Sequence, residues 1–89
     1  MEVPSWPSGH LAFDGKIFEF GAGELTRVPI ENLRRIEVKP PKLGRLNLEF
    51  AYQAGLNENK TGAWVEAQHE AELNELVAAV QAAIGGGSA

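Results

Sequence analysis

The chain has 89 residues, with eight basic and twelve acidic side chains, a net charge of −4 and no cysteine. This length allows one hydrophobic core, so we expect a single domain, and the lack of cysteine excludes disulfides and thiolate metal sites. The acidic balance argues against general nucleic-acid binding, because contacts to phosphates need a basic face.

The apolar segments of the sequence are short. None approaches the ~20 residues of a membrane-spanning helix, and the N-terminus lacks the basic start and apolar core of a signal peptide. We therefore expect a cytoplasmic protein.

Residues 1–8 are rich in proline and serine around Trp6, and we expect them to form an extended N-terminal arm. Trp6 is expected to pack on the domain, since a free indole exposes much apolar area. Strands are then predicted over residues 11–13, 16–20 and 24–28. The dipeptide Asp14-Gly15 between the first two is typical of a tight hairpin, because both residues tolerate positive φ.

The middle of the chain alternates in the manner of half-buried strands. Pro29 cannot donate to a β-ladder and so indicates a turn, which Ile30 and Leu33 anchor. Alternation then predicts strands over residues 34–39, 45–52 and 63–68. Residues 40–44 are expected to form a turn, and the polar residues 53–62 a mobile loop.

From about Glu70 the apolar period becomes helical, and Leu73, Leu76, Val77, Val80 and Ile84 form one stripe. The helix is expected to end at Ile84, before Gly85-Gly86-Gly87, leaving residues 85–89 as a flexible tail.

Six short strands followed by one helix favour a mainly β fold of the α+β type, because a parallel sheet would need crossover helices. An antiparallel roll or partly open barrel, capped by the C-terminal helix, buries all of these faces. A seventh strand, if present, would lie within residues 1–8 or 53–62. The expected core includes the inward members of the strongest patterns, which are Ile36, Leu48, Phe50, Leu76 and Val80.

Four segments together resemble a bacterial pleckstrin-homology-like (PH-like) domain: residues 9–16, the proline-started segment 28–38, the strand 45–50 and the helix 72–84. The resemblance covers residues 9–84. It implies two nearly orthogonal antiparallel sheets of seven strands, a helix at one end, and a binding or assembly role without catalysis. Relatives that bind phosphoinositides carry a lysine and an arginine pair around the first hairpin. Here that hairpin has only Lys16 between Asp14 and Glu19, so this function is not carried over.

No arrangement of side chains points to catalysis, a metal or another cofactor. His10 and His69 each lack a second ligand at metal-binding spacing, and Glu70, Glu72 and Glu75 suit the helix dipole rather than a divalent cation. The serines lie in the terminal segments, so a Ser-His-Asp triad is not expected. We therefore expect a non-enzymatic protein without a small-molecule substrate.

The candidate partner-binding residues are the cations of segment 34–45, which carries a net charge of +4 against −8 for the rest of the chain, together with Trp6. These residues are Arg34, Arg35, Lys39, Lys42, Arg45 and Trp6. Two hypotheses follow. The first is protein–protein interaction or self-association, through sheet edges or exposed anchors such as Trp6, Tyr52, Leu56 or Trp64. The second is salt-dependent binding of an anionic membrane surface. The simplest alternative is that the cations are only solvated strand exteriors.

Overall fold

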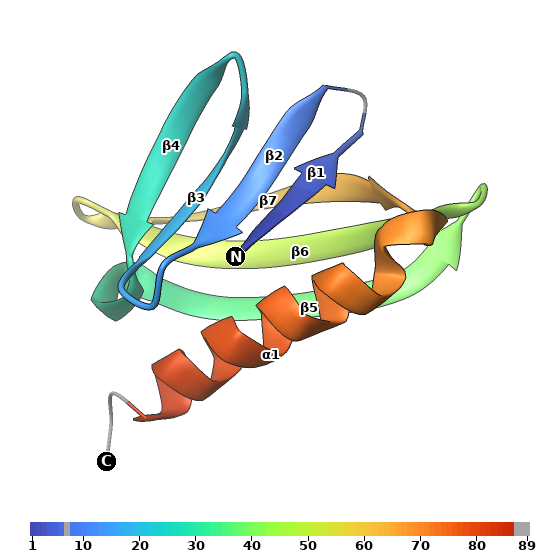
Figure 1. Cartoon of the computed structure of the whole chain (residues 1–89). Coiled ribbons are helices and arrows are strands. Elements are labelled where there is room, and N and C mark those ends of the chain that lie inside the picture. Colours follow the sequence, from blue (N-terminus) through green and yellow to red (C-terminus); the bar gives the residue numbers. More distant parts are fainter. Residues whose placement is uncertain (7, 87–89) are drawn as a thin grey trace.

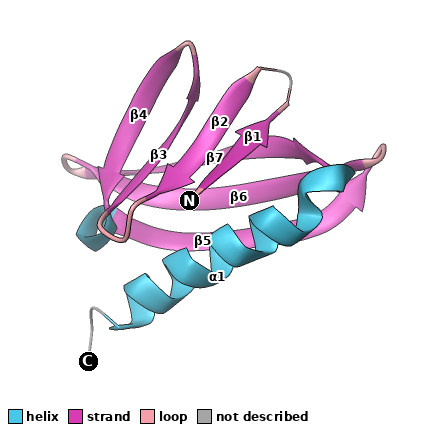
Figure 2. Cartoon of the chain, viewed as in Figure 1, coloured by secondary structure: helices cyan, strands magenta, loops and turns pink. Residues whose placement is uncertain are grey.

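A computed structural model describes residues 1–6 and 8–86 and shows a mainly β chain that ends in one helix (Figures 1 and 2). The strands form two antiparallel sheets, in the orders β1-β2-β3-β4 and β5-β6-β7. The elements are β1 (Glu2–Ser5), β2 (Gly9–Phe13), β3 (Ile17–Ala22), β4 (Glu24–Pro29), the 3-10 turn η1 (Ile30–Asn32), β5 (Leu33–Lys42), β6 (Arg45–Ala54), β7 (Asn57–Glu66), the 3-10 turn η2 (Ala67–His69) and α1 (Glu70–Gly86).

The sequence did not decide whether a seventh strand exists, and the first sheet contains it. Residues 2–5, expected within an extended arm, pair with β2 in the register Val3↔Leu11, and both side chains are fully buried. The β2–β3 hairpin is closed by Asp14, whose Oδ1 accepts 2.8 Å hydrogen bonds from the backbone N–H groups of Lys16 and Ile17. These two donors lower the pKa of the Asp14 carboxyl.

The predicted loop over residues 53–62 is wrong. Strand β6 continues to Ala54 and β7 already begins at Asn57, so that only Gly55 and Leu56 form the turn. Gly55 supplies the positive φ of +63° that the first position of such a turn needs. The polar residues extend the hairpin beyond the core, where the backbone ladder holds them. Because they lie outside the core, the sequence shows no apolar alternation there.

The predicted turn over residues 40–44 is also too long. Strand β5 runs to Lys42; besides a register shift between Leu33 and Arg35, its pairing with β6 is interrupted between Lys39 and Lys42. Pro40 and Pro41 lie in that interruption, where no ladder donor is required, and β5 is an edge strand, which is where a sheet tolerates proline.

Helix α1 packs along β5 (Figure 1) and buries the predicted apolar stripe, with Leu73, Leu76 and Val80 fully covered. The side-chain amide of Gln81 donates a 2.9 Å hydrogen bond to the carbonyl of Ile36 and so ties the helix to β5. The helix extends to Gly86, two residues beyond the predicted end. The rest of the predicted tail, residues 87–89, lies outside the described residues.

The core fills the space between the two sheets and the helix. Its centre is aromatic: the ring of Phe50 lies edge-on to Phe18 and Phe20, with centroids 5.0 and 4.6 Å away. All five predicted core residues are buried, at 3% exposure or less. The two sheets do not close into a full barrel. In the described part of the chain, one isolated bridge between Trp6 and Trp64 joins the end of β1 to β7.

Candidate interaction surface

The predicted cations of segment 34–45 do not form one cluster. The segment folds into the β5–β6 hairpin, with Lys42 and Arg45 paired at its turn and Arg35 near the other end of β5. Arg35 and Lys42 are seven positions apart along the strand, or about 23 Å at ~3.3 Å per residue. The basic segment therefore has two distinct ends.

The turn of this hairpin consists of Leu43 and Gly44, with φ angles of +55° and +76°. Positive φ at both central positions defines the type I′ turn, which strongly favours Asn-Gly. Leu43 is the only non-glycine residue with positive φ in the described ranges 1–6 and 8–86, and its side chain is 85% exposed. An exposed leucine in this conformation gains no burial to offset a strain of about 1–2 kcal/mol.

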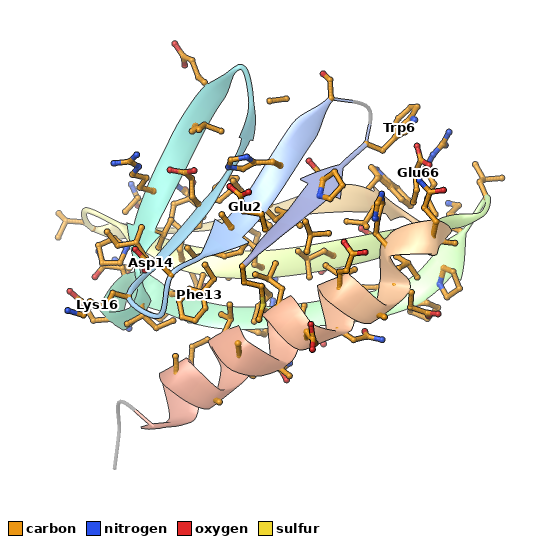
Figure 3. The ribbon with its side chains drawn as sticks, in the orientation of Figure 1. Glu2, Trp6, Phe13, Asp14, Lys16 and Glu66 are labelled. Atoms are coloured by element: carbon orange, nitrogen blue, oxygen red, sulfur yellow. The ribbon has the colours of Figure 1, made fainter. Side chains whose placement is uncertain are left out.

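Trp6 lies against the same end of the hairpin (Figure 3). Its backbone N–H donates a 2.7 Å hydrogen bond to the carbonyl of Trp64, which holds the backbone of Trp6 beside β7. The guanidinium carbon of Arg45 lies 3.8 Å from the Trp6 ring centroid, a cation–π contact. Trp6 is nevertheless 42% exposed.

We call Trp6, Lys42, Leu43 and Arg45 the tip surface. It joins an apolar side chain, an amphipathic aromatic ring and two cations. Beside it an open hollow of about 410 Å³ is lined by Leu43, Gly44, Arg45, Glu66, Ala67 and Gln68. Glu66 stands opposite Arg45 in the β6–β7 register and partly offsets the positive charge.

Two of the other three predicted cations, Arg34 and Lys39, are engaged locally. Arg34 donates from Nη1 to the carbonyl of Glu31 at 3.3 Å. Lys39 pairs with Glu37 at 3.0 Å, and this contact lowers the pKa of the Glu37 carboxyl. Arg35 lies opposite Ala51 on β6 and is exposed. The structure therefore brings Trp6 and Arg45 together and places Arg34 and Arg35 away from them.

Sequence reasoning missed Leu43, the most unusual residue of the surface. The turn residues alone do not reveal it, because Leu43-Gly44 becomes a two-residue turn only through the pairing of Lys42 with Arg45. Among the other suggested anchors, Leu56 is 99% exposed, whereas Tyr52 and Trp64 are partly buried.

A second polar cluster lies on the outer face of the first sheet. Glu19 accepts hydrogen bonds from Nε of Arg27 at 2.7 Å and from Nε2 of His10 at 2.9 Å. The carboxylate can only accept, so the contact places the imidazole proton on Nε2. The two partners, Arg27 first, lower the pKa of the Glu19 carboxyl.

An open hollow of about 730 Å³ lies beside this cluster. It is lined by Met1, Glu2, Ala12, Phe13, Asp14, Ile17, Glu19 and Arg27. In register, Glu2 pairs with Ala12, which pairs with Glu19, so that the small side chain of Ala12 lies between two carboxylates. We call this hollow the sheet hollow.

Within residues 1–6 and 8–86 no group of three or more histidine, aspartate or glutamate side chains is arranged to hold a metal ion. No helix in the same ranges is long and apolar enough to cross a membrane. Neither a protein-family model nor a curated protein matches the sequence.

Proposed function

We propose that this chain is a PH-like domain that acts as a non-enzymatic binding and assembly module. In this proposal it contacts a protein partner, or a second copy of itself, through the tip surface. The order of elements supports the fold assignment, since a four-stranded and a three-stranded antiparallel sheet are followed by a single helix. The count of seven strands agrees with what the resemblance implies.

The observation that carries the proposal is the conformation and exposure of Leu43. Strained backbone that folding does not require is found where a binding or switching role maintains it. A turn of this type accepts asparagine without the same strain, because asparagine tolerates the left-handed region. The leucine instead places an apolar side chain in solvent next to Lys42 and the stacked pair of Trp6 and Arg45.

A protein surface suits this combination better than an anionic bilayer. The two cations of the tip are few, Glu66 opposes one of them, and the whole chain carries −4, so a negatively charged bilayer would repel most of the molecule. Aromatic and arginine side chains are the usual anchors of protein interfaces. Binding of an anionic membrane surface through the hairpin cations is the second candidate, favoured by the exposed apolar residue between two basic ones.

Site-specific photo-crosslinking in the cell that makes the protein tests the proposal. Benzoylphenylalanine replaces Leu43 in one variant and Leu56 in a matched control, since both leucines are exposed in two-residue turns. We expect protein adducts from position 43 and few from position 56. Adducts to lipid at position 43 would favour the second candidate. Equal yields at the two positions, or none at position 43, would overturn the assignment of the tip surface.

A further inference from the structure

The tip surface has charged and apolar groups that remain available to a partner. In the described part of the chain, neither Lys42 nor Arg45 makes an ion pair, and Leu43 contributes nothing to the core. A partner that fits it needs an apolar contact for the leucine and carboxylates within reach of the two cations.

The sheet hollow has these features. Met1 and Ile17 on its rim are 54% and 36% exposed, and they offer apolar surface. Glu2 is exposed and forms no ion pair with any described residue, and Asp14 is also exposed. The volume of about 730 Å³ is within the ~300–1,000 Å³ range of ligand-binding pockets.

The spacing of the carboxylates suits a basic side chain. Glu2 and Glu19 lie two strands apart across Ala12, a separation of about 9–10 Å at ~4.8 Å per strand. A cationic group can enter between them above the small alanine. Positive groups also border the hollow: Arg27 is held by Glu19, Lys16 lies in the adjoining turn, and the N-terminal ammonium of Met1 donates a 3.3 Å hydrogen bond to the carbonyl of Phe13. Glu2 and Asp14, which form no ion pair with any described residue, are therefore the carboxylates available to a new cation.

The tip surface and the sheet hollow lie at different places on the molecule. In Figure 3, Trp6 and Glu66 mark one end, while Asp14 and Lys16 mark the opposite end and Glu2 lies between. One copy therefore cannot place its own hairpin turn in its own hollow. Contact between two different surfaces on successive copies is heterologous and adds subunits head to tail.

We propose that the sheet hollow is the receptor for the tip surface of a second copy of this chain. Leu43 of one copy packs against the apolar rim formed by Met1 and Ile17. Lys42 and Arg45 then face Glu2 and Asp14 of the receiving copy. The inference rests on the proposed function, since it names a second copy as the partner of the same tip surface.

The test uses two charge reversals that block opposite surfaces. Lys42→Glu disables the tip surface and leaves the hollow intact, whereas Glu2→Lys disables the hollow and leaves the tip intact. Both residues are exposed, so both variants are expected to fold. The matched control pair is Lys60→Glu and Glu58→Lys, two exposed residues of β7 near the other hairpin turn.

Sedimentation equilibrium at low salt and high protein concentration measures the outcome. We expect the parent and both control variants to associate progressively, and each reversal to weaken self-association about tenfold or more. An equimolar mixture of Lys42→Glu and Glu2→Lys retains one functional tip and one functional hollow. It is expected to regain association, because the intact tip meets the intact hollow and the two reversed charges attract each other at the second contact, and higher salt is expected to weaken this association.

Several results would overturn the inference. They are a parent that stays monomeric at every concentration, a mixture that stays monomeric, or control variants that lose association as fully as the two reversals. These failures are distinguishable from failure of the proposed function. Protein adducts at position 43 to a different protein, combined with a monomeric mixture, would retain the tip surface as a binding site and reject the second copy as its partner.

Discussion

The two hairpins of the three-stranded sheet share β6 and end in similar turns, yet they present different surfaces. The β6–β7 turn exposes Leu56 almost completely, but Gly55 takes the positive φ, so the leucine is unstrained. The β5–β6 turn forces Leu43 itself into the left-handed region, between Lys42 and Gly44, and Arg45 at the end of the turn stacks on Trp6. We therefore base the proposed binding site on the combination of exposure, backbone strain and neighbouring cations, and not on an exposed leucine alone.

The largest expected effect comes from the strand that both hairpins share. Phe50→Ala removes the ring that packs edge-on against Phe18 and Phe20, and we expect it to lower the free energy of unfolding by about 3–5 kcal/mol. Leu56→Ala is the control and should change it by less than ~0.5 kcal/mol. Urea denaturation measures both. A Phe50→Ala variant as stable as the parent would show that the aromatic cluster is not the core.

The next prediction concerns the connection between the β5–β6 hairpin and helix α1. Gln81→Ala removes the hydrogen bond to the Ile36 carbonyl and should cost about 1–2 kcal/mol, because a partly buried acceptor loses its partner. Gln53→Ala is matched to it, since Gln53 donates to the exposed Gly55 carbonyl at the other hairpin. Amide hydrogen exchange should accelerate in β5 for Gln81→Ala alone. Equal acceleration in β5 and β7 would contradict a local role of this hydrogen bond.

The strain at Leu43 predicts that a substitution there raises the free energy of unfolding. Leu43→Asn places a residue that tolerates positive φ in the type I′ turn, so we expect a gain in stability of about 1 kcal/mol. Leu56→Asn relieves no strain and should stay within ~0.5 kcal/mol of the parent. Thermal unfolding compares the stability of the two variants with that of the parent. A destabilised Leu43→Asn variant would mean that the leucine packs in solution in a way that its exposure does not reveal.

The smallest expected effect is on pH dependence. Lys39 lowers the pKa of Glu37 in the folded state, so this pair stabilises the fold above the unfolded pKa of about 4.3, and the contribution disappears as the pH falls through the folded pKa. Both side chains are about two-fifths exposed, so salt should weaken the effect. Glu37→Gln should therefore lower the melting temperature slightly at pH 7 and not at pH 3. A difference from the parent that persists unchanged at pH 3 would contradict this interpretation.

Much of the fold was predictable because the core is periodic in sequence. Leu48 and Phe50 alternate with polar residues, Leu76 and Val80 repeat with the helical period, and all four are buried. The end of β6 (residues 53–54) and the first part of β7 (residues 57–62) were missed because they extend past the core, where backbone hydrogen bonds hold polar residues that carry no apolar pattern. Val3 was missed because an edge strand of four residues that contains Pro4 shows no alternation.

The candidate surface was predictable only in part. The basic segment and Trp6 were identifiable from composition, but contact between Trp6 and Arg45 depends on pairing between the first and last strands, which are distant in sequence. The conformation of Leu43 depends on how far the ladder extends past Pro40 and Pro41. That register follows from β6 and cannot be inferred from the turn residues alone.

The central claim is that the tip surface, and not exposed leucine in general, mediates association. Sedimentation velocity over a concentration series compares the parent, Leu43→Asn and Leu56→Asn under the same low-salt buffer. The account predicts that the sedimentation coefficient rises with concentration for the parent and for Leu56→Asn and stays at the monomer value for Leu43→Asn. The same rise in all three proteins, or in none, would contradict it.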